Sequence, residues 1–425
     1  MTRFIDRHPK QRPSAASQVN RRSFLGGSFA LALGAAGGSS LLAACGGDSG
    51  GGPAGGSAGA YPLARPDDPV TLPIFDDNQP IESGLEPEKA DALRVLNYAD
   101  YMAPGVMKDF QKKYGAEVQV TPYNNYDEML TKISAPGAAF DVVFPGPSVM
   151  SRMVYGQLLQ PFQHSYLPNL TNAWPEYQDP WYDLGSQYSV PYTVYTTGIG
   201  YRSDRVSDPS EGYRMLWNPE YSGKMGVLDD SGEALGMAML AWDITRDINT
   251  DDPELINAAK DKLNELIPLG VKVDITQYET IANGKFTVHQ AWSGDMIAAR
   301  WYLAGGATKQ DLGYWIPESK ADVVIGNDNI CIPKSSPSPV LAHAFINSIL
   351  DNTIAEKNFN WNGYQPPLTK LNAEYLIDKG YITENLMSAV VVPEDFESGI
   401  KFYEQTPAVE NLYLAAFQEF QSGGS

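Results

Sequence analysis

The chain has 425 residues, of which 43% are hydrophobic and 19% charged, the composition of a folded protein with two or more folding units. Its formal net charge is -20, but residues 1–44 carry six Lys or Arg and one acid, so the remainder carries -25. A surface this acidic repels nucleic acid and anionic headgroups, which argues against a nucleic-acid partner. It favours cationic ligands only in a general way, since acidity also serves solubility.

The cysteines and histidines do not form a recognisable site. Cys45 and Cys331 are too few for a disulfide framework, and Cys331 lies in an apolar run that predicts a small buried hydrophobe. The four histidines are scattered, without an HExxH motif or a Cys/His cluster. We therefore expect no metal and no cofactor.

Residues 1–45 have the pattern of an export signal. Arg21 and Arg22 form a twin-arginine pattern ahead of an apolar stretch, which ends in a sequence that resembles a bacterial lipobox, Leu42-Ala43-Ala44-Cys45. A lipobox implies cleavage before Cys45 and a lipid on its sulfur, which holds the protein to a membrane. The alternative is a transmembrane anchor, but the Gly and Ser content of residues 26–40 disfavours it.

Residues 46–92 are expected to be a tether followed by an extended arm. Residues 46–60 are mostly Gly, Ser and Ala, which cannot pack a core, and residues 61–91 are rich in Pro and Asp without clear periodicity.

From residue 93 onward, strands alternate with helices, which predicts a parallel α/β sheet. The segment 189–201 is long and β-prone, so it could cross between two lobes. We expect strands at the start of 93–105 and at 117–122, 140–144, 189–201, 225–228, 286–292 and 323–333, and helices at 106–114, 126–134, 253–267 and 409–421.

Two tyrosines lie where the first strand passes into the first helix. Tyr98 and Tyr101 follow the apolar run of this strand, and Pro104 and Gly105 precede the helix. In open α/β sheets, ligands bind outside the carboxyl ends of the strands. On this stretch alone, however, packing is the better interpretation of both rings.

An acidic pair follows a later strand. Asp230 and Glu233 are three residues apart, so both can lie on one side of the first turn of a helix. The same spacing is that of a capping box, which explains these residues equally well.

Further acids and aromatic residues follow other strands. Trp292 and Asp295 suit a cation, or else a core tryptophan and a helix N-cap. Asp328 precedes an apolar run, where a turn aspartate is the usual interpretation, and Tyr364 follows a glycine, where packing is usual.

Taken together, these residues are what a site for an organic polyammonium ligand needs. Carboxylates bind ammonium groups through charge-assisted hydrogen bonds. Ring faces contribute ~0.5–2 kcal/mol for each cation–π contact and also contact the methylenes.

Several motifs, in this order, resemble the spermidine/putrescine-binding proteins of bacterial ABC importers. They are NYADYMAPG (97–105), FDVVFPGPSVMSRM (140–153), VPYTVYTTGIGYRSD (190–204), WNPEYSGKMGVLDDSGEALGMAML (217–240), WSGD (292–295), DNICIP (328–333) and NGYQPP (362–367). The resemblance implies ligand contacts by the aromatic pair Tyr98 and Tyr101, the acids Asp230 and Glu233, the pair Trp292 and Asp295, the central acid Asp328, and Tyr364. The chain departs from the family at Gly146-Pro147-Ser148, where relatives often have Ser and Tyr contacts, and at Gly326, where some have an aromatic residue. The family's last contact has no evident counterpart in 402–405.

The resemblance also implies the type II periplasmic-binding-protein fold, with two α/β lobes and a ligand cleft between them. Lobe one would comprise 93–199 plus 328–376, and lobe two 200–327 plus 377–425. Ligand closure would be a hinge motion. The protein would be a monomeric, lipid-anchored receptor, not an enzyme, that delivers a polyamine to an ABC permease.

Two other functions remain open from the residues. A glycoside hydrolase would use two of the acids, but none lies in a recognisable catalytic motif. A protein of the same fold could bind a sugar or an iron chelate, yet four carboxylates are excessive for a neutral ligand.

Overall fold

The computed structural model describes residues 61–423, and within them the chain from Leu63 onward forms one compact unit. The twin arginines, the lipobox with Cys45, and the Gly-rich segment 46–60 lie outside the described residues.

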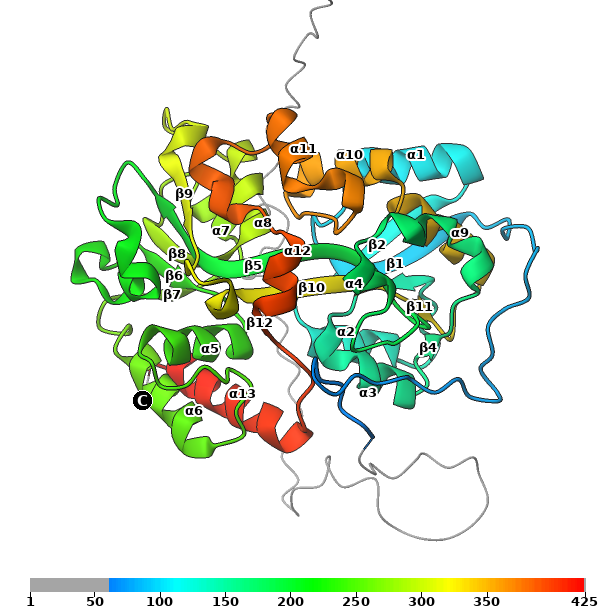
Figure 1. Ribbon diagram of the computed structural model, residues 1–425, viewed down its shortest axis with the longest axis horizontal. Coiled ribbons are helices and arrows are strands. Elements are labelled where there is room, and N and C mark those ends of the chain that lie inside the picture. The colour runs from blue at the N-terminus through cyan, green and yellow to red at the C-terminus, as the bar shows by residue number, and fades with distance from the viewer. Residues whose placement is uncertain (1–60, 424–425) are drawn as a thin grey trace, which may run out of the picture. The chain divides into compact units, whose positions relative to one another are not determined.

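One lobe is built on a small parallel sheet (Figure 1). The sheet has the order β2-β1-β3, and a bridge between Val143 and Cys331 continues it to the antiparallel pair β11 and β4. Its strands are β1 (Ala92–Tyr98), β2 (Glu117–Tyr123), β3 (Val142–Val143), β4 (Leu159–Gln160) and β11 (Ile332–Pro333). Its helices are α1 (Pro104–Tyr114), α2 (Tyr126–Ile133), α3 (Met150–Tyr155), α4 (Pro175–Gln178), α9 (Pro339–Ile349) and α10 (Asn352–Asn362).

The other lobe is built on a larger, mixed sheet. Its strands have the order β12-β10-β5-β8-β6-β7, and β9 also pairs with β5. They are β5 (Val190–Arg202), β6 (Met225–Val227), β7 (Lys272–Val273), β8 (Val288–Trp292), β9 (Leu312–Trp315), β10 (Val324–Ile330) and β12 (Ile400–Lys401). The helices of this half of the chain are α5 (Ser231–Ala241), α6 (Pro253–Asn264), α7 (Gln277–Thr280), α8 (Ser293–Ala298), α11 (Ala373–Asp378), α12 (Pro393–Ser398) and α13 (Pro407–Gln421).

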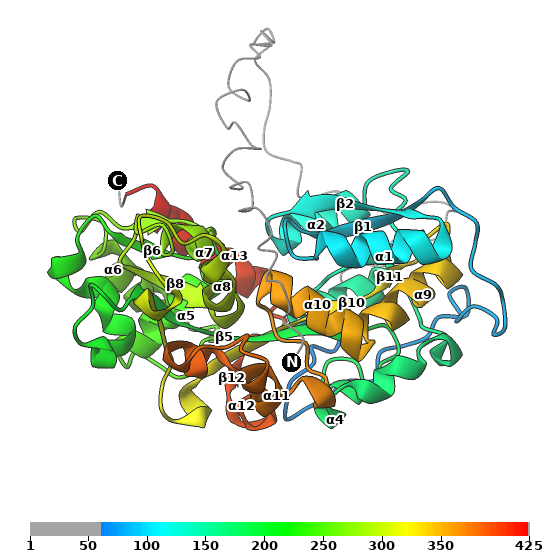
Figure 2. The same cartoon turned by 90° about the horizontal axis from the view of Figure 1, so that it is seen from above.

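The expectation of a wholly parallel sheet is wrong for this lobe. β6 pairs in parallel with β7 and β8, but β5 runs antiparallel to β8, β9 and β10. The reason is that β5 and β10 pass between the lobes in opposite directions and join the sheet as they cross (Figures 1 and 2). The strand expected to cross, 189–201, is therefore β5. The exact lobe boundaries stay a prediction.

The apolar pattern of the sequence accounts for the cores. Val142, Val143 and Phe144 are fully buried, as the near-continuous apolar run predicts for a strand covered on both faces. Cys331 is also fully buried and free, as predicted. One apolar cluster packs α2 and α3 under β1 and β3, a second joins α5, α6 and α13 to β6, and the largest extends across both lobes.

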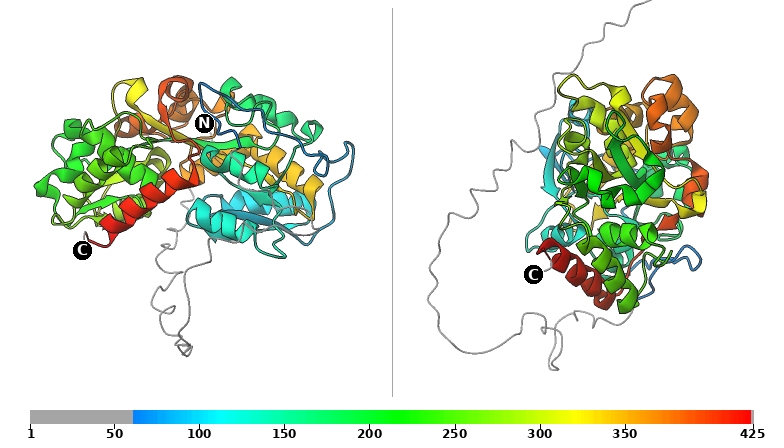
Figure 3. Two further views of the ribbon diagram at one scale, coloured as in Figure 1. Left: turned by 90° about the horizontal axis from the view of Figure 1, so that it is seen from below. Right: turned by 90° about the vertical axis from the view of Figure 1, so that its left-hand side faces the viewer.

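Residues 63–91 run in extended form over lobe one (Figure 3). The backbone of Val70 donates to Trp181 and accepts from Leu184, at 3.0 and 3.2 Å. The carboxylate of Glu88 accepts the backbone N–H groups of Val340 and Leu341 at the start of α9, at 3.1 and 2.7 Å. These contacts use backbone polar groups that would otherwise be unpaired. No helix between residues 61 and 423 is long and apolar enough to cross a bilayer.

Candidate functional site

The turn after β1 brings the first two tyrosines together. Asp100 has a φ of 55°, a left-handed conformation that aspartate tolerates better than most residues, and it turns the chain between Tyr98 and Tyr101. The two rings meet edge to face, with centroids 5.8 Å apart. The carbonyl of Tyr101 accepts from the Tyr192 hydroxyl at 2.5 Å and from the Asn362 amide at 3.0 Å, which fixes this turn.

Asp328 lies in β10 between two tyrosine hydroxyls, so its interpretation as a turn residue is wrong. Its Oδ2 accepts from Tyr101 at 2.7 Å, and its Oδ1 accepts from Tyr126 at 3.0 Å. A bulge between Asp328 and Asn329 shifts the strand register at this point, a device that re-aims side chains. Only 4% of Asp328 is exposed, and burial raises its pKa to about 6, against the effect of the two hydroxyls.

Three alternating residues of β5 connect the two ends of the site. Side chains two apart in a strand share a face, which places Thr193, Tyr195 and Thr197 together. Thr193 pairs across the sheet with Asp328, and its hydroxyl lies 2.5 Å from the Tyr101 oxygen. At the other end, the Thr197 hydroxyl donates to Glu233 at 3.0 Å.

Glu233 lies with Trp292 beside Thr197. The indole N–H of Trp292 donates to Glu233 Oε1 at 2.8 Å. Glu233 is buried, and this burial, with a smaller effect from the charge of Asp230, raises its pKa to about 8. The expected capping box is thus only half present. Asp230 Oδ1 does accept from the backbone N–H of Glu233 at 2.9 Å, but the Glu233 side chain points to Thr197 and Trp292 instead.

Asp230 differs from the other acids because solvent reaches it. Its accessible surface is that of an exposed residue, yet protein surrounds the carboxylate closely enough that desolvation raises its pKa. The backbone N–H groups of Glu233 and Gly232 act in the opposite direction.

Asp295 is the third residue of α8, so the N-cap interpretation is wrong for it. The N-cap position is Trp292. The carboxylate of Asp295 accepts a hydrogen bond from the Gln277 side-chain amide and another from Tyr364, and burial raises its pKa to about 7 against both. Tyr364 is therefore more than a packing residue.

Aromatic side chains link Asp328, Asp295 and Glu233, and Asp230 adjoins them through the backbone N–H of Glu233. The Tyr364 ring contacts Tyr101 and Tyr195, with centroids 4.9 and 5.9 Å apart, and Tyr195 contacts Trp292 at 6.2 Å. Tyr126 contacts Tyr98 at 6.4 Å. We call these residues the acid–aromatic cluster: Asp230, Glu233, Asp295, Asp328, Tyr98, Tyr101, Tyr126, Tyr195, Tyr364 and Trp292. All eight predicted site residues of the described chain belong to it, but their binding role stays a prediction.

Tyr126 and Tyr195 were missed by the sequence reasoning, as were Thr193, Thr197 and Gln277. Tyr126 begins α2 three residues after β2 ends, so it carried the same positional signal as Tyr98 and was overlooked, whereas Tyr195 lies mid-strand and carried no such signal. The alternation of 193, 195 and 197 was readable in the sequence, but nothing there indicated which face of β5 meets the acids.

Gly146 and Gly326 each make room for one of these tyrosines. A Cβ at position 146 would lie 2.3 Å from the Tyr126 hydroxyl oxygen, and one at position 326 would lie 2.7 Å from the Tyr195 ring. Each glycine thus leaves space that a tyrosine from another element fills. In the segment 402–405, the Gln405 amide donates to the Asn249 carbonyl at 2.9 Å.

The arrangement suits a cation with separated charges. Within residues 61–423, no group of His, Cys, Asp and Glu is placed to hold a metal ion, so the acids do not converge on one point. The hydrogen bonds described above come to them from neutral donors: hydroxyl, indole, amide and backbone groups. Such donors orient a carboxylate without cancelling its charge, which leaves the charge available to a ligand.

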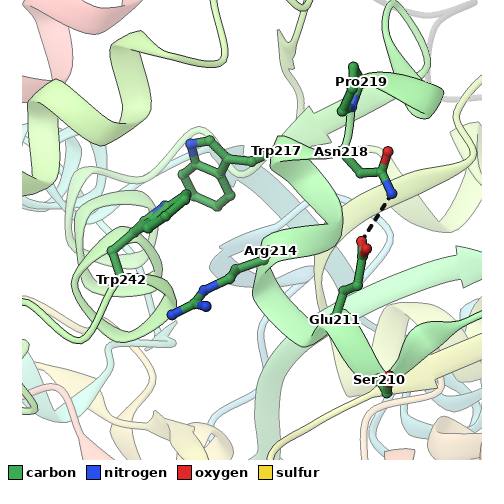
Figure 4. Close-up of a pocket in the computed structure, with 7 residues that line it drawn as sticks. All are labelled: Ser210, Glu211, Arg214, Trp217, Asn218, Pro219 and Trp242. Atoms are coloured by element: carbon green, nitrogen blue, oxygen red, sulfur yellow. Dashed lines mark hydrogen bonds between the residues drawn. The ribbon is translucent and has the colours of Figure 1, made fainter.

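A separate surface pocket of about 580 Å³ lies elsewhere in lobe two (Figure 4). None of its lining residues belongs to the acid–aromatic cluster. Its Arg214 donates to the Ala241 carbonyl at 2.6 Å and to Asp243 at 3.1 Å, and Asn218 donates to Glu211 at 3.1 Å. Because Arg214, Asn218 and Glu211 already have hydrogen-bond partners, the acid–aromatic cluster is the better candidate site.

Comparison with known proteins places the chain in a family. The model of the bacterial extracellular solute-binding proteins matches residues 105–383, which is well over half of the chain. The chain therefore belongs to the bacterial extracellular solute-binding proteins, a family of transport proteins and not of enzymes. Membership agrees with the export predicted from the N-terminal segment.

Individual relatives cover most of the chain. It is 27% identical to spermidine/putrescine-binding periplasmic protein 1 of Haemophilus influenzae, over 74% of this chain and 87% of that protein. It is 29% identical to the putrescine/cadaverine-binding protein of Pseudomonas aeruginosa, over 65% and 80%. A substrate-binding protein of a spermidine/putrescine ABC transporter from Streptococcus pneumoniae superimposes with a TM-score of 0.64 at 23% identity, over 79% of this chain and 100% of that one. The expected two-lobe, type II periplasmic-binding-protein fold is thereby confirmed.

Proposed function

We propose that this protein is an exported receptor that binds a linear polyamine between its lobes and delivers it to an ABC permease. The observation that carries the proposal is the acid–aromatic cluster, in which three carboxylates contact a row of aromatic side chains and a fourth, Asp230, lies beside Glu233. The relatives named for spermidine, putrescine and cadaverine support it. Polyamines carry separated ammonium groups joined by methylenes, which is the chemistry that separated acids and ring faces bind.

The register of β5 favours a triamine over a short diamine. Asp328 pairs with Thr193, while Glu233 accepts from Thr197, four residues further along the same strand. At ~3.3 Å per residue these positions are about 13 Å apart. An extended triamine such as spermidine matches this span better than putrescine, whose four-carbon chain is much shorter.

Binding without turnover is the activity that these contacts support. Asp328, Glu233 and Asp295 are held by tyrosine, tryptophan, threonine and glutamine donors, an arrangement that orients acids for recognition. A neutral sugar would leave several buried carboxylates without a charged partner, which is costly. The ligand's own charge supplies that partner.

Isothermal titration calorimetry of the purified protein tests the proposal. We expect spermidine to bind more tightly than putrescine, and a neutral disaccharide not to bind. Release of a glycan product, or binding of a neutral solute with no response to either polyamine, would refute polyamine recognition. Equal affinity for both polyamines would refute only the preference for a triamine.

The lipid anchor is a further part of the proposal. Because Leu42-Ala43-Ala44-Cys45 has the pattern of a lipobox, Cys45→Ser should remove the attachment atom and release the protein from membranes or leave it unprocessed. Membrane fractionation with metabolic lipid labelling measures both effects. Cys331→Ser is the matched control, since that cysteine is buried and should leave fractionation unchanged. A lipid-labelled, mature-sized Cys45→Ser product would contradict the anchor.

A further inference from the structure

Tyr126 is held at Asp328 by local structure on its own side. It is the first residue of α2, whose N-cap Asn125 accepts the backbone N–H of Glu128 at 2.9 Å. The Glu128 carboxylate in turn accepts the backbone N–H of Asn124 at 2.8 Å. These bonds fix the helix start, and with it the direction in which the Tyr126 side chain leaves the backbone.

The space for the Tyr126 hydroxyl exists because residue 146 is a glycine. Gly146 has a φ of -84°, which any residue adopts, so the backbone does not require glycine there. A side chain would, however, meet the hydroxyl oxygen at 2.3 Å and the ring carbon that bears it at 3.0 Å. Gly146 therefore matters for space alone, and even alanine would push the hydroxyl away from Asp328.

The two hydroxyls divide the Asp328 carboxylate between them. Tyr101 takes Oδ2 and Tyr126 takes Oδ1, which leaves a second lone pair on each oxygen. Both donors are neutral, so neither hydrogen bond cancels the charge of the ionised Asp328 carboxylate. We propose that Tyr126 is a positioning residue for Asp328, whose hydroxyl, admitted by Gly146, orients the carboxylate so that its free lone pairs meet a ligand ammonium group. The role rests on the proposed polyamine function.

The surroundings of Asp328 make its protonation measurable. The titratable side chains that its charge affects are six further tyrosines and Tyr126 itself, and burial raises the pKa of every one: Tyr98, Tyr101, Tyr123, Tyr126, Tyr192, Tyr195 and Tyr364. All of them stay neutral between pH 5 and pH 8. Among Asp328 and these tyrosines, Asp328 is therefore the group that titrates between pH 5 and pH 8.

Two variants remove the same hydrogen bond by different routes. Tyr126→Phe deletes the hydroxyl, and Gly146→Ala displaces it. We expect each to weaken spermidine binding roughly tenfold, because a hydrogen bond to a charged group is lost. In an Asp328→Asn background, Tyr126→Phe should change affinity less than about twofold, since the group that it positions is gone.

The matched control is Tyr123→Phe, which removes a nearby hydroxyl that donates to the Phe144 carbonyl and not to an acid. A second readout needs no ligand: carbon-13 NMR titration of the Asp328 carboxyl should give a higher pKa in Tyr126→Phe and Gly146→Ala, and an unchanged pKa in Tyr123→Phe. An unchanged Asp328 pKa in Tyr126→Phe would overturn the inference, whether or not the protein binds a polyamine. A tenfold loss that persists in the Asp328→Asn background would also overturn it and would make Tyr126 a direct ligand contact.

Discussion

Asp328→Asn should weaken spermidine binding by about 2–5 kcal/mol, because an ammonium group would be left in a buried place without its charged partner. Asp328 is 4% exposed and accepts hydrogen bonds from both tyrosine hydroxyls. We therefore expect the loss of binding free energy that is typical of a buried charge pair, and not the smaller loss at a solvent-exposed rim. Asparagine keeps the size of the side chain and can keep one accepted hydrogen bond. The variant therefore tests charge more than shape.

Titration calorimetry of Asp328→Asn beside Asp229→Asn measures this effect. Asp229 is an exposed acid next to the cluster, and it accepts from Gln421 at 2.8 Å. Each substitution removes one negative charge, but Asp229→Asn should change affinity little, since exposed charges are screened. Similar losses in both variants would mean that overall acidity, and not a specific contact, attracts the ligand.

Much of the fold could be predicted because its signals are local. The apolar run 140–144 predicts a buried strand, and Val142 and Val143 form one. Asp252 and Pro253 predict the start of a helix, and the Asp252 side chain accepts from Glu254 at 2.8 Å there. Strand direction was not predictable in the same way. Whether β5 pairs in parallel or antiparallel depends on the return path of β10, more than a hundred residues later.

In the candidate site, too, residues with a local sequence signal could be predicted and the others could not. Acids and rings at strand ends, such as Glu233 and Trp292, carry a positional signal, because the carboxyl ends of strands gather at one edge of a sheet. Tyr195 carries none. Its place in the cluster depends on Gly326 lying opposite it across the β5–β10 pair, a register that no stretch of sequence contains.

The rival interpretations could be separated only by side-chain direction. Asp230 and Glu233 have the spacing of a capping box, and the sequence does not say where the Glu233 carboxylate points. In the structure it turns toward Thr197 and Trp292, while Asp230 alone serves as the cap. Asp230 thus caps the helix, whereas the Glu233 carboxylate takes no part in capping and lies with the other residues of the cluster.

The buried acids of the cluster should make the ligand-free protein less stable as pH rises from about 4 to 8. Burial raises the pKa of Asp328 to about 6, of Asp295 to about 7 and of Glu233 to about 8. Between their ordinary values and these raised ones, the folded protein holds protons that the unfolded chain has released. Unfolding then releases protons. The contribution of the three acids to the free energy of unfolding is therefore full below about pH 4 and is lost as pH rises through their raised pKa values.

Ligand binding should show the opposite trend, since an ammonium group favours the ionised carboxylates. Near pH 7, Glu233 and Asp295 are still partly protonated, so binding a polyamine should release protons. For each proton released, affinity should rise about tenfold per pH unit between pH 6 and pH 8. This linkage also means that the ligand stabilises the protein most at the pH where the free acids destabilise it most.

Calorimetry in two buffers of different ionisation enthalpy measures the released protons directly, and thermal unfolding measures the stability trend. His343 has the opposite effect on thermal unfolding. Burial lowers its pKa, so its contribution to stability is lost as pH falls. Comparison with Glu233→Gln removes this difficulty: His343 is unchanged, while the decline in stability between pH 6 and pH 8 should become shallower. In the same variant, proton release at pH 7 should fall and affinity should depend less on pH. A binding enthalpy that is equal in both buffers, with a dissociation constant that is flat from pH 6 to pH 8, would show that the acids are already ionised before the ligand arrives.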